Sequence, residues 1–222
     1  VDSARNCVIF FHGLSANKSF LSNEAAMFRK WGYNVMLVDM RAHGNSGGNT
    51  STYGIKETDE VQKAFEWAGS KGNDKIILYG MSMGSAVALK AVADKKIQPE
   101  AIIADMPFNN LRQLLGAKAE DLGFPSEPFA TLVTFWIGIE RGYNGFEHRV
   151  PDYATKVHCP VLVQWGARDR FVDREEITEI YDQIASTHKK LVTYPDADHQ
   201  SLLVVDPLAW ENEVKNFLAT LP

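Results

Sequence analysis

Short apolar runs alternate regularly with longer amphipathic stretches along this chain, and this alternation constrains the fold more than any other feature. Most of the apolar runs are nearly continuous in β-branched and aromatic residues, which is typical of strands covered on both faces of a parallel sheet. The alternation predicts an α/β fold, a three-layer α/β/α sandwich with a mostly parallel, doubly wound sheet and right-handed crossovers. The predicted strands are 8–11, 34–39, 75–79, 101–105, 161–165 and 191–194, and the predicted helices are 22–31, 55–70, 83–94, 173–186 and 207–220.

One segment, residues 108–156, interrupts the alternation. It contains no clear strand but many large apolar residues, and 131–138 is almost uninterrupted apolar sequence. Long insertions between two strands often carry function, so we expect a small helical cap within a single domain that spans 1–222. The apolar run has to bury its surface, either against the helices of the sheet or as a roof over a site. Two helices that only cover the edge of the sheet are the alternative.

Composition excludes several classes of partner. Lys and Arg number 23 and Asp and Glu number 28, a net charge of −5, so we expect no basic surface for nucleic acid or an anionic membrane. The longest apolar runs are well short of the ~20 residues of a membrane span. No signal-peptide pattern begins the chain, so we expect a cytoplasmic protein unless an upstream signal or anchor has been trimmed. Cys7 and Cys159 each adjoin an apolar run, so we expect two buried thiols. The chain has neither a His-Glu-x-x-His nor a Cys-x-x-Cys motif, so we expect no metal and no cofactor.

The sharpest motif is Gly80-Met81-Ser82-Met83-Gly84, which lies between a predicted strand and a predicted helix. A nucleophilic serine needs its hydroxyl on a tight strand-to-helix turn with small neighbours, and the two glycines provide that room. The N-terminus of the following helix also favours negative charge that develops beside Ser82. The motif therefore predicts that Ser82 is a nucleophile, and a simple tight turn is the alternative interpretation.

A nucleophilic serine needs a base, which in turn needs an orienting acid. Loops that follow the strands of a parallel sheet gather at the carboxyl ends of those strands. His199 lies on such a loop after the last predicted strand, and Asp169 follows the strand before it. Nucleophile, acid and base then occur in the chain order Ser82, Asp169, His199. Asp105, at the end of an earlier strand, is the alternative acid.

The first predicted strand ends in Phe10-Phe11-His12-Gly13-Leu14. Acyl transfer needs two backbone N–H groups to stabilise the oxyanion, and we assign these donors to Leu14 and Met83. His12 is expected to be structural, with its ring hydrogen-bonded beneath this loop. Arg41 and His43, in the glycine-rich loop 39–48, are likewise expected to shape the backbone, because no Lys-Ser/Thr follows them to bind phosphate.

Five motifs together resemble those of the α/β-hydrolase superfamily: His12-Gly13, Asp39-x-Arg41-x-His43-Gly44-x-Ser46, Gly80-x-Ser82-x-Gly84, Gly166-x-x-Asp169 and His199. Over nearly its whole length the chain is similar to the branch of serine esterases, lipases and acyl-thioesterases with a short helical cap. The family loop usually reads Arg-Gly-His-Gly, and Ala42 replaces its first glycine here. Family members usually carry two further strands upstream, so the chain is expected to be either a minimal form or a trimmed piece.

The resemblance implies a serine hydrolase, more specifically a carboxylesterase, that acts on small-molecule esters or thioesters without a cofactor. A small cap implies short-to-medium acyl chains, roughly C4 to C8, whereas an open groove for a palmitoyl-length chain is the alternative. Two other functions stay open, because a fold does not determine a function. One is a peptidase domain similar to that of prolyl oligopeptidases, and the other is a ligand receptor or interaction module. The sequence leaves the natural substrate and the oligomeric state undetermined.

Overall fold

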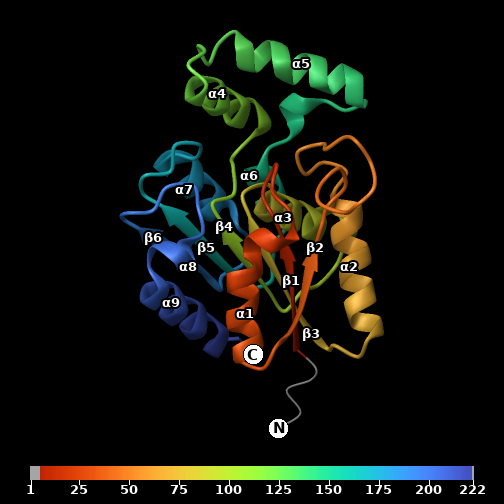
Figure 1. The fold of residues 1–222 in the computed structure, drawn as a ribbon, viewed down its shortest axis with the longest axis vertical. Coiled ribbons are helices and arrows are strands. Elements are labelled where there is room, and N and C mark those ends of the chain that lie inside the picture. The colour runs from red at the N-terminus through yellow and green to blue at the C-terminus, as the bar shows by residue number, and fades with distance from the viewer. Residues whose placement is uncertain (1–5, 222) are drawn as a thin grey trace.

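The computed structural model describes residues 6–221, and its strands form a six-stranded sheet (Figure 1). The strand order is β2-β1-β3-β4-β5-β6, and every neighbouring pair is parallel. The predicted α/β fold is confirmed, and each predicted strand is present to within a few residues. The strands are β1 (Asn6–Phe11), β2 (Asn34–Val38), β3 (Lys75–Met81), β4 (Ala101–Asp105), β5 (Val161–Gly166) and β6 (Lys189–Tyr194).

The sheet is doubly wound, because the strand order runs one way from β1 to β2 and the other way from β3 to β6. Right-handed crossovers therefore place helices on both faces. One face is covered by α1 (Ser22–Lys30) and α9 (Pro207–Ala219). The other is covered by α2 (Thr58–Ser70), α3 (Met83–Lys95), α6 (Val150–Ala154) and α7 (Arg174–Gln183), which pack one against the next (Figure 1). Shorter turns of helix are η2 (Lys18–Leu21), η3 (Gly145–Glu147) and α8 (Leu202–Val205).

Side-chain hydrogen bonds fix the chain at the start of some helices, which hydrophobic spacing alone does not reveal. Helix α2 begins at Thr58, later than predicted, because the Glu57 carboxylate accepts the backbone N–H of Gly54 at 3.0 Å and holds the preceding turn. Helix α7 begins after Asp173, whose side chain accepts the backbone N–H of Glu176 at 2.8 Å in a capping box.

The core lies between the sheet and its two helix layers. On the face covered by α1 and α9, four buried aromatic rings pack with centroids 5.1–6.4 Å apart: Phe10, Phe28, Tyr79 and Trp210. Burying a large apolar side chain contributes roughly 1.5–3 kcal/mol, so this cluster anchors both helices to the central strands. This packing fixes the positions of β1 and β3, and with them the loops at their carboxyl ends.

Residues 108–156, called the cap segment below, lie mainly beyond the carboxyl ends of the strands. Its helices α4 (Leu111–Asp121) and α5 (Phe129–Arg141) pack against each other at the top of Figure 1. The chain enters and leaves at adjacent positions, which we call the neck. There, the N–H of Leu111 donates to the carbonyl of His148 at 3.2 Å, and the N–H of Val150 donates to the carbonyl of Asn109 at 2.7 Å. The two helices lie over the ends of the strands rather than along an edge of the sheet.

The expectation that the apolar run 131–138 buries its surface holds for one side of α5 and is wrong for the other. The inward residues Ala130, Thr134 and Gly138 are small and buried, which lets neighbouring chain segments approach closely. The large residues Phe135 and Trp136 are 49% and 62% exposed. Helix α5 is nevertheless short, and within residues 6–221 no helix has both the length and the apolar character needed to cross a membrane.

Candidate active site

Ser82 lies on a strained turn between β3 and α3, with φ 54° and ψ −115°. Both flanking glycines are required by close backbone contacts. A Cβ added to Gly84 would lie 1.9 Å from the carbonyl oxygen of Phe11, and one added to Gly80 would lie 2.4 Å from Gly84. The N–H of Ser82 donates to the carbonyl of Asp105 at 2.8 Å, which ties the turn to β4. The backbone therefore holds this serine at the end of the sheet in a conformation that side chains rarely adopt.

His199 and Asp169 are brought together by the loops after β6 and β5. Nδ1 of His199 lies 2.7 Å from Oδ2 of Asp169, whose side chain is fully buried. The other oxygen of Asp169 accepts the backbone N–H groups of Phe171 at 2.8 Å and Val172 at 3.1 Å. Because a carboxylate only accepts hydrogen bonds, Nδ1 carries a proton and Nε2 of the neutral ring is left as the acceptor.

The loop that carries His199 crosses the carboxyl edge of the sheet. The loop leaves β6, which is one edge strand of the sheet. Two residues after His199, the Ser201 hydroxyl donates to the carboxylate of Glu24 on α1, the helix that connects β1 to the opposite edge strand, β2. Arg170 ties this loop to the Asp169 loop, because its Nε donates to Asp198 at 2.9 Å. That bond lowers the pKa of Asp198 to about 2, so the tie persists at neutral pH. The residues on either side of His199 are thus tied to the Asp169 loop and to α1.

Ser82 and His199 make no hydrogen bond to each other within the described part of the chain. The Ser82 hydroxyl and Nε2 of His199 both lack a hydrogen-bond partner among residues 6–221, so both atoms are available to a substrate. Nucleophile and base are often apart in unliganded enzymes and come together when substrate binds. The Phe171 ring packs edge-on against the imidazole, with centroids 5.2 Å apart, and limits its rotation.

The residues proposed to supply the oxyanion donors flank Ser82. A Cβ added to Gly13 would lie 3.5 Å from Cβ of Ser82, so the loop after β1 contacts Ser82. The backbone N–H groups of Leu14 and Met83 have no acceptor among the described residues. Free N–H groups beside a nucleophile are the arrangement that stabilises an oxyanion.

Two histidines hold this loop in place, as expected from the sequence. Nε2 of His12 accepts the N–H of Met40 at 3.1 Å, so its Nδ1 donates to the carbonyl of Gly13 at 2.8 Å. Nε2 of His43 accepts the N–H of Ser15 at 3.1 Å. Burial lowers the pKa of His12, which favours the neutral ring that these bonds require. Both side chains support the backbone on either side of Leu14.

Ala42 adopts a left-handed backbone conformation, which glycine adopts more readily. Its φ is 60°, and its N–H donates to the carbonyl of Gly47 at 3.1 Å, which closes the loop after β2. A left-handed conformation costs an L-residue roughly 1–2 kcal/mol. The loop therefore retains its shape with a local strain at Ala42.

A buried polar network beneath Ser82 was missed by the sequence analysis. The Asp105 carboxylate accepts hydrogen bonds from the Tyr79 hydroxyl and, at 2.8 Å, from the Gln164 side-chain amide. The Tyr194 hydroxyl donates to the same Gln164 at 2.6 Å, and Trp210 donates to Tyr79 at 3.2 Å. Burial raises the pKa of Asp105 to about 7. The five residues of this network, Asp105 included, come from four strands and one helix, so no local motif could reveal them.

A second contact that sequence reasoning missed joins the neck to the loop beside α3. Nε2 of His148 lies 2.9 Å from the carbonyl of Tyr53, and Nδ1 lies 3.0 Å from the Tyr153 hydroxyl. Burial lowers the pKa of His148 to about 4, so the ring is neutral and Nε2 donates to Tyr53. A Cβ added to the next residue, Gly54, would lie 3.8 Å from the carbonyl of Met83. The cap segment is thus linked to the turn that carries Ser82.

The sequence matches the family described as "Serine aminopeptidase, S33" over residues 2–134 and 141–205. The chain belongs to this family of α/β hydrolases. The resemblance of the S33 chain to esterases and lipases of the α/β-hydrolase fold is confirmed by its relatives.

The "Uncharacterized protein YqkD" of Bacillus subtilis is 27% identical to this S33 chain over 217 residues, which are 96% of the chain and 71% of that protein. The "Monoacylglycerol lipase" of Mycolicibacterium smegmatis is 24% identical over 248 residues, 93% of the chain and 88% of the lipase. Among solved structures, the esterase Pf2001 of Pyrococcus furiosus superposes with a TM-score of 0.80 at 27% identity, covering 98% of the chain and 84% of the esterase. Several other curated relatives are longer, and the chain spans 41–59% of their length.

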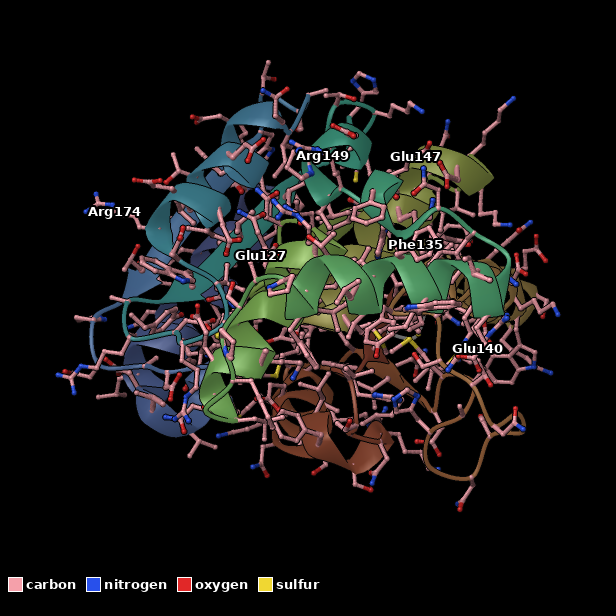
Figure 2. All side chains as sticks on the ribbon, turned by 90° about the horizontal axis from the view of Figure 1, so that it is seen from above. Glu127, Phe135, Glu140, Glu147, Arg149 and Arg174 are labelled. Carbon is pink, nitrogen blue, oxygen red and sulfur yellow. The ribbon has the colours of Figure 1, made fainter. Side chains whose placement is uncertain are left out.

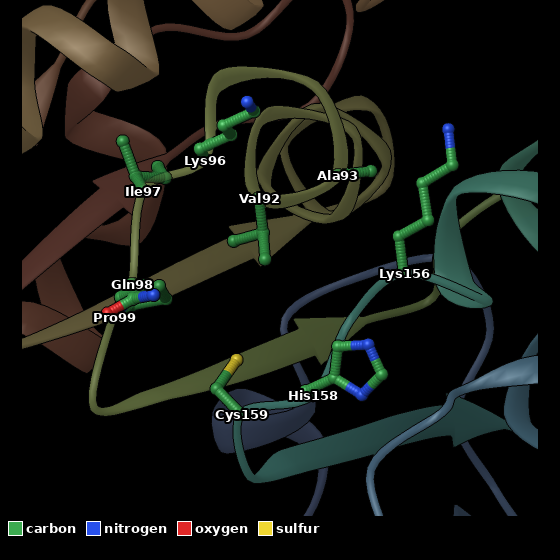
Figure 3. Close-up of a pocket in the computed structure, with 9 residues that line it drawn as sticks. All are labelled: Val92, Ala93, Lys96, Ile97, Gln98, Pro99, Lys156, His158 and Cys159. Carbon is green, nitrogen blue, oxygen red and sulfur yellow. The ribbon is translucent and has the colours of Figure 1, made fainter.

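A cavity of about 540 Å³ in this S33 hydrolase lies at the amino ends of β4 and β5, opposite the end that carries Ser82 (Figure 3). Cys159 lines it and is only partly buried, unlike the buried thiol expected, whereas Cys7 is buried as expected. Desolvation raises the pKa of Cys159 to about 12, which disfavours a reactive thiolate.

Within the described residues, no group of three or more His, Cys, Asp and Glu side chains is arranged to hold a metal ion.

Proposed function

We propose that this protein is a serine carboxylesterase that hydrolyses small esters or thioesters through an acyl-enzyme at Ser82. The observation that carries the proposal is the 2.7 Å contact between Nδ1 of His199 and the buried Asp169 carboxylate, which leaves Nε2 free to accept a proton. The strained turn at Ser82 and the family of the chain support the same reaction class. The esterase Pf2001 and the monoacylglycerol lipase among its relatives point to ester substrates.

In the proposed reaction, Oγ of Ser82 attacks the acyl carbon while its proton passes to Nε2 of His199. The N–H groups of Leu14 and Met83 stabilise the oxyanion, and loss of one such donor would raise the barrier by about 3–4 kcal/mol. Collapse breaks the bond to the leaving group, which takes the proton from His199. Water then attacks the acyl-enzyme by the same route and releases the acid. Asp169 orients the imidazole and stabilises its charged form.

Asp169 is proposed as the acid instead of Asp105 because of where each carboxylate is engaged. Asp169 accepts from His199 and from two backbone N–H groups on its own loop. Asp105 accepts hydrogen bonds from Tyr79 and Gln164 on the two neighbouring strands, and makes no contact with His199 among the described hydrogen bonds. A carboxylate that binds the imidazole directly can control its tautomer, and one held elsewhere cannot.

The inner side of the cap segment supports a preference for short-to-medium acyl chains. Leu111, Leu115 and Ala130 are buried there, and Tyr53 packs against this cluster from the body. Because Tyr53 adjoins the loop beside Met83, an acyl chain directed from Ser82 towards the cap segment meets side chains early. Each buried methylene adds about 0.8 kcal/mol, so kcat/KM is expected to rise about fourfold per carbon until the space is full, at roughly C4 to C8.

An aminopeptidase is the second candidate, because the matching family carries that description. Such an enzyme has to bind the charged amino terminus of its substrate beside the scissile bond, a task suited to an unengaged carboxylate. Asp169 is fully engaged by His199, Phe171 and Val172. Asp169 therefore does not offer such a carboxylate, and both substrate classes belong in the same assay.

Labelling with a fluorophosphonate tests the nucleophile. Ser82→Ala is expected to abolish labelling and to lower ester turnover more than about 100-fold, since loss of a nucleophile removes the acyl-enzyme route. Ser85→Ala is the matched control, because Ser85 lies on the same turn with its hydroxyl bound to the carbonyl of Asp105 at 2.8 Å. Labelling that persists in Ser82→Ala would refute the assignment, and labelling without any turnover would favour a ligand receptor.

A ladder of p-nitrophenyl esters, matching thioesters and aminoacyl p-nitroanilides tests the substrate class. The proposal expects ester or thioester turnover to exceed anilide turnover, with kcat/KM highest at roughly C4 to C8. A maximum at about C12 or beyond would instead indicate an open groove for long chains. Anilides as the best substrates would identify an aminopeptidase.

A further inference from the structure

The cap segment exposes more large apolar side chains than any other part of the described chain. Leu132, Phe135, Trp136 and Ile139 recur at helical spacing on the outward side of α5 and are 49–62% exposed; we call these four residues the outer face. Figure 2 shows α5 lying across the top of the molecule, with Phe135 labelled on it. Four more exposed apolar residues surround the outer face: Leu122, Phe124, Phe129 and Phe146.

The size of this apolar surface matches one side of a stable protein interface. Large side chains offer roughly 150–250 Å² each, so eight that are about half exposed present on the order of 800 Å². The largest apolar patch of a typical monomer is about 300–600 Å². A specific complex buries about 800 Å² on each partner, and interface cores are enriched in aromatic residues.

A hollow beside the outer face is suited to a large side chain from outside. It has a volume of about 420 Å³ and is lined by α5 and the turn that follows it, including Gly138, Gly142 and Gly145. Phe135 and Phe146 also line it, so an aromatic ring entering the hollow would meet aromatic neighbours. Aromatic side chains that fill pockets at the centre of an interface commonly dominate its binding energy.

The charges around α5 favour a protein partner over a lipid surface. Helices that lie in a membrane interface usually carry Lys and Arg along their polar side. The flanks of the outer face instead carry Thr131 and paired charges: Glu140 lies 3.9 Å from Arg141 at one end, and Arg112 is paired with Glu127 at 2.6 Å at the other. The whole chain has a net charge of −5, which opposes binding to anionic lipid.

We propose that the outer face binds a second copy of this chain, with the two α5 helices antiparallel about a two-fold axis. A two-fold contact is self-complementary, so Trp136 of each copy enters the hollow of the other. The hollow is lined by the second half of α5 and the turn after it, so this contact brings the C-terminal halves of the two helices together. Glu140 and Arg141, whose charged groups are 3.9 Å apart within each copy, then lie near their counterparts, and their charges balance.

Sedimentation velocity tests the proposal with the full chain. The wild-type protein is expected to be dimeric at about 100 µM, the range in which interfaces of this size are occupied. Trp136→Glu is expected to raise the dimer dissociation constant at least about 100-fold, because it places a charge in the apolar hollow. Trp67→Glu is the matched control: Trp67 is 53% exposed on α2, away from the cap segment, and its replacement should leave the dimer intact.

Glu140→Lys provides a second, milder variant on the exposed surface, and circular dichroism confirms that each variant is folded. Glu140→Lys should weaken the dimer several-fold, and more so at low salt. A wild-type protein that stays monomeric at about 100 µM would overturn the proposal. So would equal weakening by Trp67→Glu and Trp136→Glu. Monomers that float with phosphatidylcholine vesicles through Trp136 would assign the outer face to a lipid surface instead.

Discussion

Asp169 is fully buried and holds the imidazole of His199 through a single 2.7 Å contact, although the two residues lie on loops after different strands. Two backbone N–H groups fix the other carboxylate oxygen, so the orientation of Asp169 does not depend on His199. The proposed acid is therefore positioned in advance, and the proton of the imidazole stays on the nitrogen that faces it.

Asp169→Asn is expected to lower kcat by a factor on the order of 10³–10⁴, because an amide facing Nδ1 favours the wrong tautomer of His199. Asp105→Asn should have a much smaller effect, since its side chain is bound by Tyr79 and Gln164. Steady-state kinetics on one ester compares the two variants. The opposite ranking would transfer the role of the acid to Asp105.

Gly84→Ala is expected to disrupt the turn at Ser82, because its added Cβ would lie 1.9 Å from the carbonyl oxygen of Phe11 and backbone atoms must move. A loss of stability of at least about 1–3 kcal/mol and a large loss of activity should follow. Gly69→Ala in α2 is the control, since nothing lies within 4 Å of its added Cβ, and it should be neutral or stabilising by up to about 1 kcal/mol. Urea unfolding measures the stability of each variant, and ester turnover measures its activity. Equal stability and activity of the two variants would contradict the close contact at Gly84.

Ala42→Gly is expected to stabilise the protein, which reverses the usual sign of this substitution. The φ of 60° at Ala42 costs an L-residue about 1–2 kcal/mol, and glycine avoids that cost at an entropic penalty of about 0.5–1 kcal/mol. The free energy of unfolding should rise by about 0.5–1 kcal/mol. Ala26→Gly, on the exposed side of α1, should lower it by about 1 kcal/mol. Urea denaturation of both variants decides, and a loss at Ala42 would show that the loop is not strained.

The buried Asp105 predicts a pH dependence of stability. Burial raises its pKa to about 7, whereas an aspartate in an unfolded chain titrates near 3.9. Between these values the folded protein holds a proton that the unfolded chain has lost, so the free energy of unfolding falls as pH rises from about 4 to 7. Asp105→Asn removes this contribution, and its stability should decline less than that of the wild type between pH 5 and 8. Urea unfolding across this range measures the difference, and parallel curves would contradict the proposed protonation.

The residues of the candidate site could be named from the sequence because each lies on the turn or loop that follows a strand. In a parallel sheet, strand ends converge, so the order of Ser82, Asp169 and His199 along the chain was enough to propose them together. Helix ends were less predictable, since side chains such as Glu57 and Asp173 settle them through individual hydrogen bonds. Spacing of apolar residues carries no information about such bonds.

Two features could not be predicted from the sequence, for different physical reasons. The contact of Asp105 with Gln164 joins residues on different strands, and no spacing along the chain encodes it. In α5, both sides of the helix are apolar, so periodicity cannot tell which side is buried. The structure buries small residues such as Gly138 and exposes large ones such as Trp136, the reverse of the usual expectation for a helix on a core.

The neck has a consequence for how a protein of this kind can change over evolutionary time. The chain departs at Asn109 and returns at Val150, and these two residues are joined by a 2.7 Å backbone hydrogen bond. Helices α4 and α5, which lie between them, can be lengthened, shortened or replaced without altering these two points of attachment. Because the proposed catalytic residues Ser82, Asp169 and His199 all lie outside that stretch, new substrate preferences can arise by exchanging the helices while the proposed chemistry is inherited unchanged.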